Sequence, residues 1–159
     1  MTDKRELILS RLFTILQGIQ GVATDPYTGG PCVYRNRDQL PDQLRPGILL
    51  LDGDEEANQT ARQNQRPGKS PNLMTIKPEV YVSLTTAKPD NTTIGADLNA
   101  FRILILKAVL TDNTLQGYCD NGGELWYNAT ITDLARGRAM MGEMGLAFWL
   151  TYALIPSQL

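Results

Sequence analysis

The chain has 159 residues, of which 42% are hydrophobic and 20% charged, and its net charge is −2. This size and composition predict a single domain, residues 1–159, that buries a core of its own. Proteins that bind nucleic acid usually carry a basic excess, so sequence-specific nucleic-acid binding is disfavoured. No run approaches the roughly 20 apolar residues of a membrane span, so we expect no membrane partner.

Few side chains of this sequence titrate near neutral pH, because the chain has no histidine and only two cysteines, Cys32 and Cys119. Without histidine, a Ser–His or Cys–His nucleophile pair is excluded, and two distant cysteines do not make a zinc site. Neither glycine-rich segment has the spacing of a phosphate or dinucleotide loop. We therefore expect no enzymatic activity, no cofactor and no metal. An enzyme that uses a pair of carboxylates remains an alternative.

The cysteines are expected to be free thiols. No export signal precedes them, and the reducing cytosol is then the default compartment. A disulfide between them would require Cα atoms within about 7 Å, which the sequence does not test.

The first half of the chain predicts one helix and two strands. Apolar residues from Ile8 to Ile19 follow helical spacing, which predicts a helix over Asp3–Ile19. A Gly- and Pro-rich loop at 25–31 separates this helix from a short strand at Cys32–Arg35. The apolar run Ile48–Leu51 predicts a strand buried on both faces.

A dense group of carboxylates comes directly after that strand, formed by Asp52, Asp54, Glu55 and Glu56. Their spacing does not match a calcium loop, so a solvated turn is the preferred interpretation. The polar residues that follow predict a long loop or arm at about 54–73, with its polar part at Ala57–Asn72. Its charged residues are Arg62, Arg66 and Lys69. Loops of this length are usually functional or disordered, so this arm is a candidate for ordering against a partner.

The second half predicts strands around another helix. Alternation predicts a strand over Leu73–Leu84, with an edge or bulge at Pro78. Asp97 is the expected N-cap of a helix that ends near Leu110. The remaining strands are expected at Glu124–Thr132 and from Met144 to Leu154. Between them we expect a turn or bulge at Arg136–Arg138, with a helical turn at Leu134–Met141 as the alternative.

Together these elements predict an α+β fold in which a mostly antiparallel, mixed sheet carries two amphipathic helices on one face. Alternation in the last strand puts Leu146, Phe148 and Leu150 on the helix side. Trp126 and Trp149 would then lie on the opposite face. Tryptophan is enriched at protein–protein interfaces, although these two side chains could also cover the edge of the sheet.

The order of four segments resembles the tail terminator (tail completion, or minor tail) proteins of long-tailed bacteriophages. The first is the amphipathic helix Arg5–Ile19 followed by Val33-Tyr34-Arg35, and the second is the run Pro46–Glu56 before a variable loop. The third is Lys77–Leu84 ahead of the second helix. The fourth is the ending from Thr132-Asp133-Leu134 to Phe148–Tyr152, which contains the Leu-Thr-Tyr of a closing strand.

This resemblance implies a structural virion protein without enzymatic activity. Such proteins form a ring, generally of six subunits, that caps the tail tube, stops its polymerisation and presents the surface that joins the head. The implied partners are other copies of the chain, the tail tube protein and a head-completion or connector protein. The implied location is the tail or neck of the virion, after assembly in the host cytoplasm.

Residues of the arm suggest how such a ring would be held. Arg62, Arg66 and Lys69 could meet the group Asp52–Glu56 of the next subunit. Other interpretations remain open, namely a head–tail stopper or adaptor, a carboxylate-dependent enzyme, and a small-molecule-binding domain.

Overall fold

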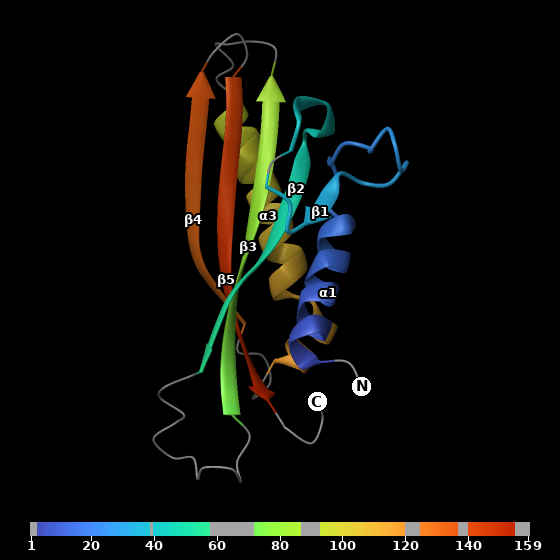
Figure 1. Cartoon of the computed structure of the whole chain (residues 1–159). Helices are drawn as coiled ribbons and strands as arrows, with labels where there is room; N and C mark the ends of the chain where they lie inside the picture. The colour runs from blue at the N-terminus through green and yellow to red at the C-terminus, as the bar shows by residue number, and fades with distance from the viewer. Residues whose placement is uncertain are drawn as a thin grey trace.

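The computed structural model describes residues 3–38, 40–57, 72–86, 93–119, 125–136 and 140–154. They form a five-stranded sheet in the order β1-β2-β3-β5-β4, and Figure 1 shows helices α1 and α3 on the same side of it. β1 is parallel to β2, whereas all other neighbouring strands are antiparallel. The predicted α+β fold with a mixed, mostly antiparallel sheet is therefore confirmed.

Helix α1, Lys4–Gln17, packs on the half of the sheet that contains β1 and β2. The side chain of Asp3 caps it by accepting a hydrogen bond from the backbone N–H of Arg5 at 3.3 Å. Gly18 follows its last turn. Most of the apolar stripe is buried, with Ile15 only partly so, which confirms the predicted helix and its orientation. The fully buried residues of the helix are Ile8, Leu9, Leu12 and Leu16.

Strands β1, Val33–Arg35, and β2, Gly47–Ala57, flank the short 3-10 helix η1, Asp42–Leu44. Ile48 and Leu50 face the helices, and Leu49 faces a second small cluster on the opposite side with Cys32, Leu40 and Leu44. The prediction that this strand is buried on both faces is confirmed for Ile48–Leu50.

β2 does not end where the sequence predicts. It continues through Asp52–Ala57, where Asp54 pairs with Lys77 and Glu56 with Thr75 of β3. The predicted solvated turn at Asp52–Glu56 is therefore wrong, and so is an arm that begins at residue 54 and ends at 73. Residues 58–71, including Arg62, Arg66 and Lys69, lie outside the described residues.

A bulge in β2 explains how the strand passes the proline in its neighbour. β3, Asn72–Thr86, runs without interruption, while the register of β2 shifts between Leu51 and Asp54. Gly53 sits in that bulge with φ of 71°, and a Cβ there would lie 1.9 Å from the carbonyl oxygen of Lys77. Pro78 has no N–H to donate, so the irregularity falls on the strand opposite it.

Helix α3, Ile94–Leu110, covers the other half of the sheet and contacts β3, β5 and β4. Its N-cap is Thr93, and Asp97 lies in its first turn, so the prediction of Asp97 as the cap is wrong. A carboxylate in the first turn suits the helix dipole equally well, which is why the sequence pattern misplaces the start.

A further helix among the described residues, α4, Asn113–Tyr118, was not predicted. Asp112 caps it by accepting a hydrogen bond from the N–H of Leu115 at 2.7 Å. The same carboxylate binds Arg11 of α1 at 2.6 Å. This one side chain therefore connects α1 with the turn between α3 and α4.

Strand β4, Leu125–Arg136, pairs from end to end with residues 140–150 of β5, Met140–Leu154. The alternative prediction of a helical turn at Leu134–Met141 is wrong for the residues described, because 134–136 belong to β4 and 140–141 to β5. The turn or bulge predicted at Arg136–Arg138 falls where β4 ends. Residues 137–139 lie outside the described residues.

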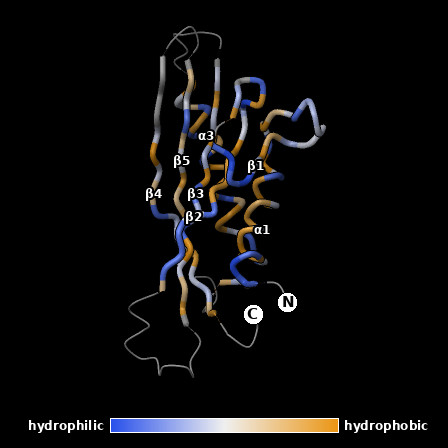
Figure 2. The backbone as a smooth tube through the Cα atoms, viewed as in Figure 1, coloured by the Kyte–Doolittle hydropathy of each residue, from blue (hydrophilic) through white to orange (hydrophobic). Residues whose placement is uncertain are grey.

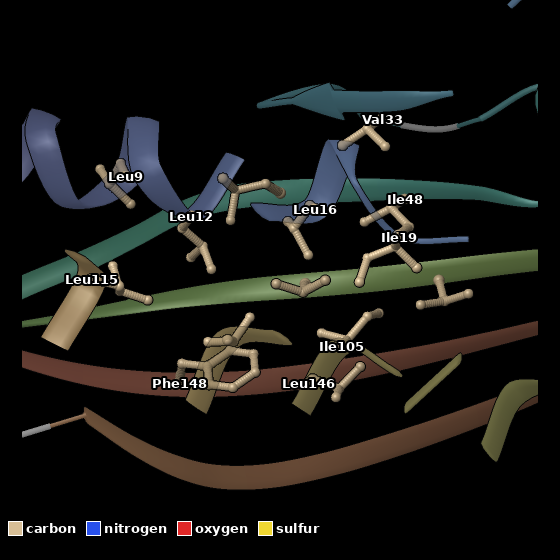
Figure 3. Packing of buried hydrophobic residues seen from close by; sticks show 14 of the residues in the cluster. Leu9, Leu12, Leu16, Ile19, Val33, Ile48, Ile105, Leu115, Leu146 and Phe148 are labelled. Carbon is tan, nitrogen blue, oxygen red and sulfur yellow. The ribbon is translucent and has the colours of Figure 1, made fainter. Parts of the chain in front are cut away.

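The main core lies between the sheet and the helices. Figure 2 shows hydrophobic segments in orange along α1 and the strands. In Figure 3, Leu12 and Leu16 of α1, Ile105 of α3 and Phe148 of β5 extend into one layer, and all four are fully buried. Cys119 belongs to this cluster and Cys32 to the smaller one, and neither cysteine forms a disulfide. Within the described ranges, no helix is long and apolar enough to cross a bilayer.

Candidate functional site: the exposed face of the sheet

We call the face of β2–β5 that points away from α1 and α3 the outer face. Pairing places Trp126 of β4 directly opposite Trp149 of β5 on this face. Their exposed fractions are 63% and 39%, so both indoles are available to a partner. The predicted position of the two tryptophans, opposite the helices, follows from the alternation seen in Phe148 and Leu150, which are buried on the helix side.

Two further apolar side chains extend the exposed strip along the same two strands. Ile131 of β4 is 71% exposed and Met141 of β5 is 38% exposed. Ile131 pairs with Gly145, while the ring of Tyr81 lies on the other side of that glycine. Exposed apolar patches of this kind mark interaction sites more often than scattered single residues do.

The position of Ile131 corrects the predicted faces of β4. Simple alternation groups Ile131 with Leu125 and Tyr127, which face the helices. The register shifts by one residue between Tyr127 and Ala129, so Thr130 turns toward α3 and accepts a hydrogen bond from Arg102. A bulge of this kind exchanges the two faces beyond it, and the sequence carries no signal for it.

Charged residues border the tryptophans on the β2 side. The ammonium of Lys77 lies 4.6 Å from the centre of the Trp149 ring and 2.7 Å from a carboxylate oxygen of Glu56. Asp54 pairs with Lys77 in the register of the strands. A row of four side chains therefore crosses the outer face of the sheet, in the order Asp54, Lys77, Trp149 and Trp126. The sequence analysis did not identify Lys77 as part of this site, because its position beside Trp149 depends on the register between two strands.

Strand alternation divides the four carboxylates between the two faces. Asp54 and Glu56 lie on the outer face, whereas Asp52 and Glu55 point toward the helices. Glu55 accepts a hydrogen bond from the hydroxyl of Tyr152, and Arg5 lies 3.9 Å away. Asp52 accepts two hydrogen bonds from Arg35, at 2.6 and 2.9 Å. The four carboxylates of the predicted interface group therefore do not all face the same side of the sheet.

Arg35 joins three elements through its guanidinium. It binds Asp52 of β2 and also donates to Glu6 of α1 at 2.7 and 2.9 Å. Hydrogen bonds from Arg35, helped by Ser10, lower the pKa of Glu6 from 4.5 to about 2. Burial raises the pKa of Asp52, but hydrogen bonds from Arg35 and Asn36 outweigh it and leave the pKa below its ordinary value. Both carboxylates are thus charged at neutral pH and serve the fold.

The remaining polar groups of the outer face are mostly satisfied within the sheet. Thr75 and Thr151 share a buried hydrogen bond of 3.1 Å, and Ser83 donates to Glu143 at 3.2 Å. Tyr81 donates to Glu79, a hydrogen bond that raises the pKa of the phenol to about 12, with burial adding to it. Among the residues described, no group of three potential ligands could hold a metal ion.

Comparison with known proteins adds no identification. No protein-family model matches the chain, and a search of curated proteins returns no match.

Proposed function

We propose that this chain is a structural virion protein that forms a homo-oligomeric ring, of six subunits in the family it resembles, at the end of a long phage tail. The ring would cap the tail tube, end its polymerisation and join a head-completion or connector protein. It would act in the tail or neck of the virion after assembly in the host cytoplasm.

The exposed pair Trp126 and Trp149 is the observation that carries this proposal. The apolar surface of these two indoles that stays in contact with water adds nothing to the stability of the domain. Tryptophan is prominent among residues that dominate binding energy at interfaces. A rim that includes Lys77, Asp54 and Glu56 surrounds the indoles on one side, as expected for an apolar contact with a polar border.

Exposed apolar side chains on the helix layer also favour a ring. Ile103 and Leu104 of α3 are 61% and 42% exposed, on the side of the molecule opposite the outer face. A closed ring uses a heterologous interface, in which each subunit contributes two different patches. Two apolar surfaces on opposite layers meet that requirement, whereas a two-fold dimer needs only one.

In the proposed ring the polar arm contacts a neighbouring subunit. The basic residues of this arm lie outside the described residues. Only Asp54 and Glu56 of the acidic group lie on the outer face, and Lys77 already pairs with Glu56. Arg62, Arg66 and Lys69 of a neighbour would therefore meet Asp54 in preference to Asp52 or Glu55. Charge reversal at Arg62 and Arg66 together should weaken the ring, and unchanged assembly of that double variant would remove this contact.

The sharpest test adds the purified chain to tail tube protein while tubes polymerise. We expect shorter tubes that carry an extra ring at one end in electron micrographs. The double variant Trp126→Ser/Trp149→Ser should lose capping at equal protein concentration, because each interface tryptophan contributes roughly 2 kcal/mol or more. Lys107→Ser is the control, since Lys107 is exposed on α3 and belongs to neither apolar surface of the proposed ring.

Tubes of unchanged length with no bound ring would overturn the proposal. Binding to portal-side components in place of tubes would assign the chain to a stopper or adaptor. Turnover of a substrate that depends on Asp52 or Asp54 would favour the carboxylate enzyme.

A further inference from the structure

The two margins of the sheet differ in how they are protected. β1 and β2 form one margin, and β4 forms the other, on the side away from β1 in Figure 1. β1 pairs with only three residues of β2, but side chains bind the backbone of β2 farther along. Asn36 accepts a hydrogen bond from the N–H of Asp52 at 3.0 Å. Arg5 donates to the carbonyl of Gly53 at 3.3 Å, in the bulge. A bulge, bound side chains and the carboxylates that follow all hinder pairing of this margin with another strand.

β4 lacks most of these protective features. Its 12 residues, Leu125–Arg136, include no proline, glycine or lysine, and the charged ones are Asp133 and Arg136. Beyond the bulge between Tyr127 and Ala129, β4 pairs with β5 in unbroken register to its end. Among the described strands, none pairs with the other side of β4. That side therefore presents a row of backbone N–H and C=O groups, whose complement is another extended chain.

Ile131 adds an apolar side chain beside this row. It is 71% exposed on the outer face, because the bulge exchanges the faces of β4 beyond it. Its neighbours Thr130 and Thr132 pair with Leu146 and Met144, which are buried on the helix side. An isoleucine between two threonines is a run of β-branched side chains, the kind that packs well across neighbouring strands.

We infer that β4 pairs with β4 of a second copy of this chain, antiparallel, about a two-fold axis at Ile131. The β2 margin is protected, so two copies that join edge to edge do so through the β4 strand of each. A two-fold axis perpendicular to the sheet makes the strands antiparallel and uses the same surface of both copies. The contact is separate from the patches of the proposed ring and does not depend on tube capping.

The side chains select the register of this pairing. With the axis at Ile131, this residue lies opposite its own copy, and Thr130 lies opposite Thr132. An axis at Thr132 would set Ile131 against Asp133, and an axis at Asp133 would oppose two like charges, which is unfavourable. The preferred register also joins the two outer faces into one surface, which carries the exposed tryptophans of both copies.

Disulfide trapping tests the register in the full chain. Ile131→Cys should give a covalent dimer on mild oxidation, because directly opposed residues have Cβ atoms about 4.5–5.5 Å apart, close to the separation in a disulfide. Thr132→Cys is the matched control, since Thr132 is exposed one residue farther along and lies opposite Thr130. The native thiols Cys32 and Cys119 are buried, at 0% and 6% exposure, which keeps the background low.

Sedimentation of the unoxidised protein measures the strength of the contact. Ile131→Lys should weaken dimerisation about 30-fold or more, because two ammonium groups would meet at the axis. Ile131→Val keeps a branched apolar side chain and should stay within about 3-fold of wild type. Amide hydrogen exchange adds a readout of the backbone: exchange at residues 129–133 should slow as the protein concentration rises, because pairing gives the N–H groups of the margin acceptors.

The outcomes separate this contact from the proposed function. A wild type that stays monomeric at the concentrations used for trapping overturns the inference. Equal trapping by Thr132→Cys, or a dimer whose β4 amides exchange unchanged, also overturns it. The dimer should persist in Trp126→Ser/Trp149→Ser, and its loss there would assign self-association to the indoles and overturn the β4 contact. Trapping as expected, with tubes that grow unchanged, would overturn the capping function and support the β4 contact.

Discussion

Replacing Arg35 by methionine should destabilise the protein in a way that depends on pH. The substitution keeps the length and apolar stem of the side chain and removes the charge that joins Glu6, Asp52 and β1. In the folded protein the pKa of Glu6 is lowered from 4.5 to about 2, so its charged form is favoured by folding. That contribution is fully present above about pH 4.5 and is lost as the pH falls toward 2.

The structure sets the size of the effect. At about 1.36 kcal/mol for each pH unit, the lowered pKa of Glu6 gives an upper limit of roughly 3 kcal/mol. The Glu6 side chain is 46% exposed, and solvent screening reduces this to about 1–2 kcal/mol. The Asp52 side chain is 20% exposed, and losing its partner adds about 1 kcal/mol. We therefore expect Arg35→Met to lower the free energy of unfolding by about 2–3 kcal/mol at pH 7.

Urea unfolding of both proteins at pH 7 and at pH 2.5 measures this difference. The gap between wild type and variant should shrink to about 1 kcal/mol or less at pH 2.5, since the carboxyls of the unfolded chain are then protonated and must lose a proton to pair with Arg35 in the folded state. Arg37→Met is the control, because Arg37 lies 4.8 Å over the Tyr34 ring and touches no titrating carboxylate among the described contacts. A gap of the same size at both pH values would refute the role assigned to Arg35.

Two further substitutions test the packing of the two faces. Gly145→Val should cost about 1–3 kcal/mol in urea unfolding, because a Cβ at Gly145 would lie 2.8 Å from the Tyr81 ring; a variant as stable as wild type would contradict this close contact. Phe148→Ala removes a fully buried ring from the core and should cost about 3–5 kcal/mol by the same measurement, and a loss below 1 kcal/mol would show that Phe148 does not fill the core as described.

Much of the fold follows from periodicity in the sequence. The helical spacing of Ile8, Leu12 and Leu16 places α1, and the alternation in β5 places Phe148 and Leu150 against the helices. These patterns work because one face of each element must be buried, and burial depends on local spacing alone. The same reasoning places Trp149 on the outer face.

Periodicity in the sequence does not predict features that depend on residues far away in the chain. The carboxylates of β2 look like a turn, yet they continue the strand because Lys77, Ile76 and Thr75 of β3 pair with them. The bulge in β4 turns Ile131 outward, and no glycine or proline in this strand indicates the bulge in the sequence. Tyr27 reads as a loop residue, and only the hydrogen bonds of Asp25 reveal that its loop is fixed. Register and side-chain networks are set by the whole fold, so a single segment does not contain them.

The division of the carboxylates changes what a neighbouring subunit can recognise. In sequence, Asp52, Asp54, Glu55 and Glu56 form one acidic surface, and any basic arm would be attracted to all of them. In the sheet, Asp52 is bound by Arg35 and Glu55 by Tyr152, while Lys77 pairs with Glu56. On the outer face, Asp54, Glu56 and Glu79 outnumber Lys77, so the surface that remains for a partner is acidic, and it lies next to two exposed indoles. Such a surface gains most of its binding energy from burying Trp149 and Trp126, and its charges set orientation more than affinity.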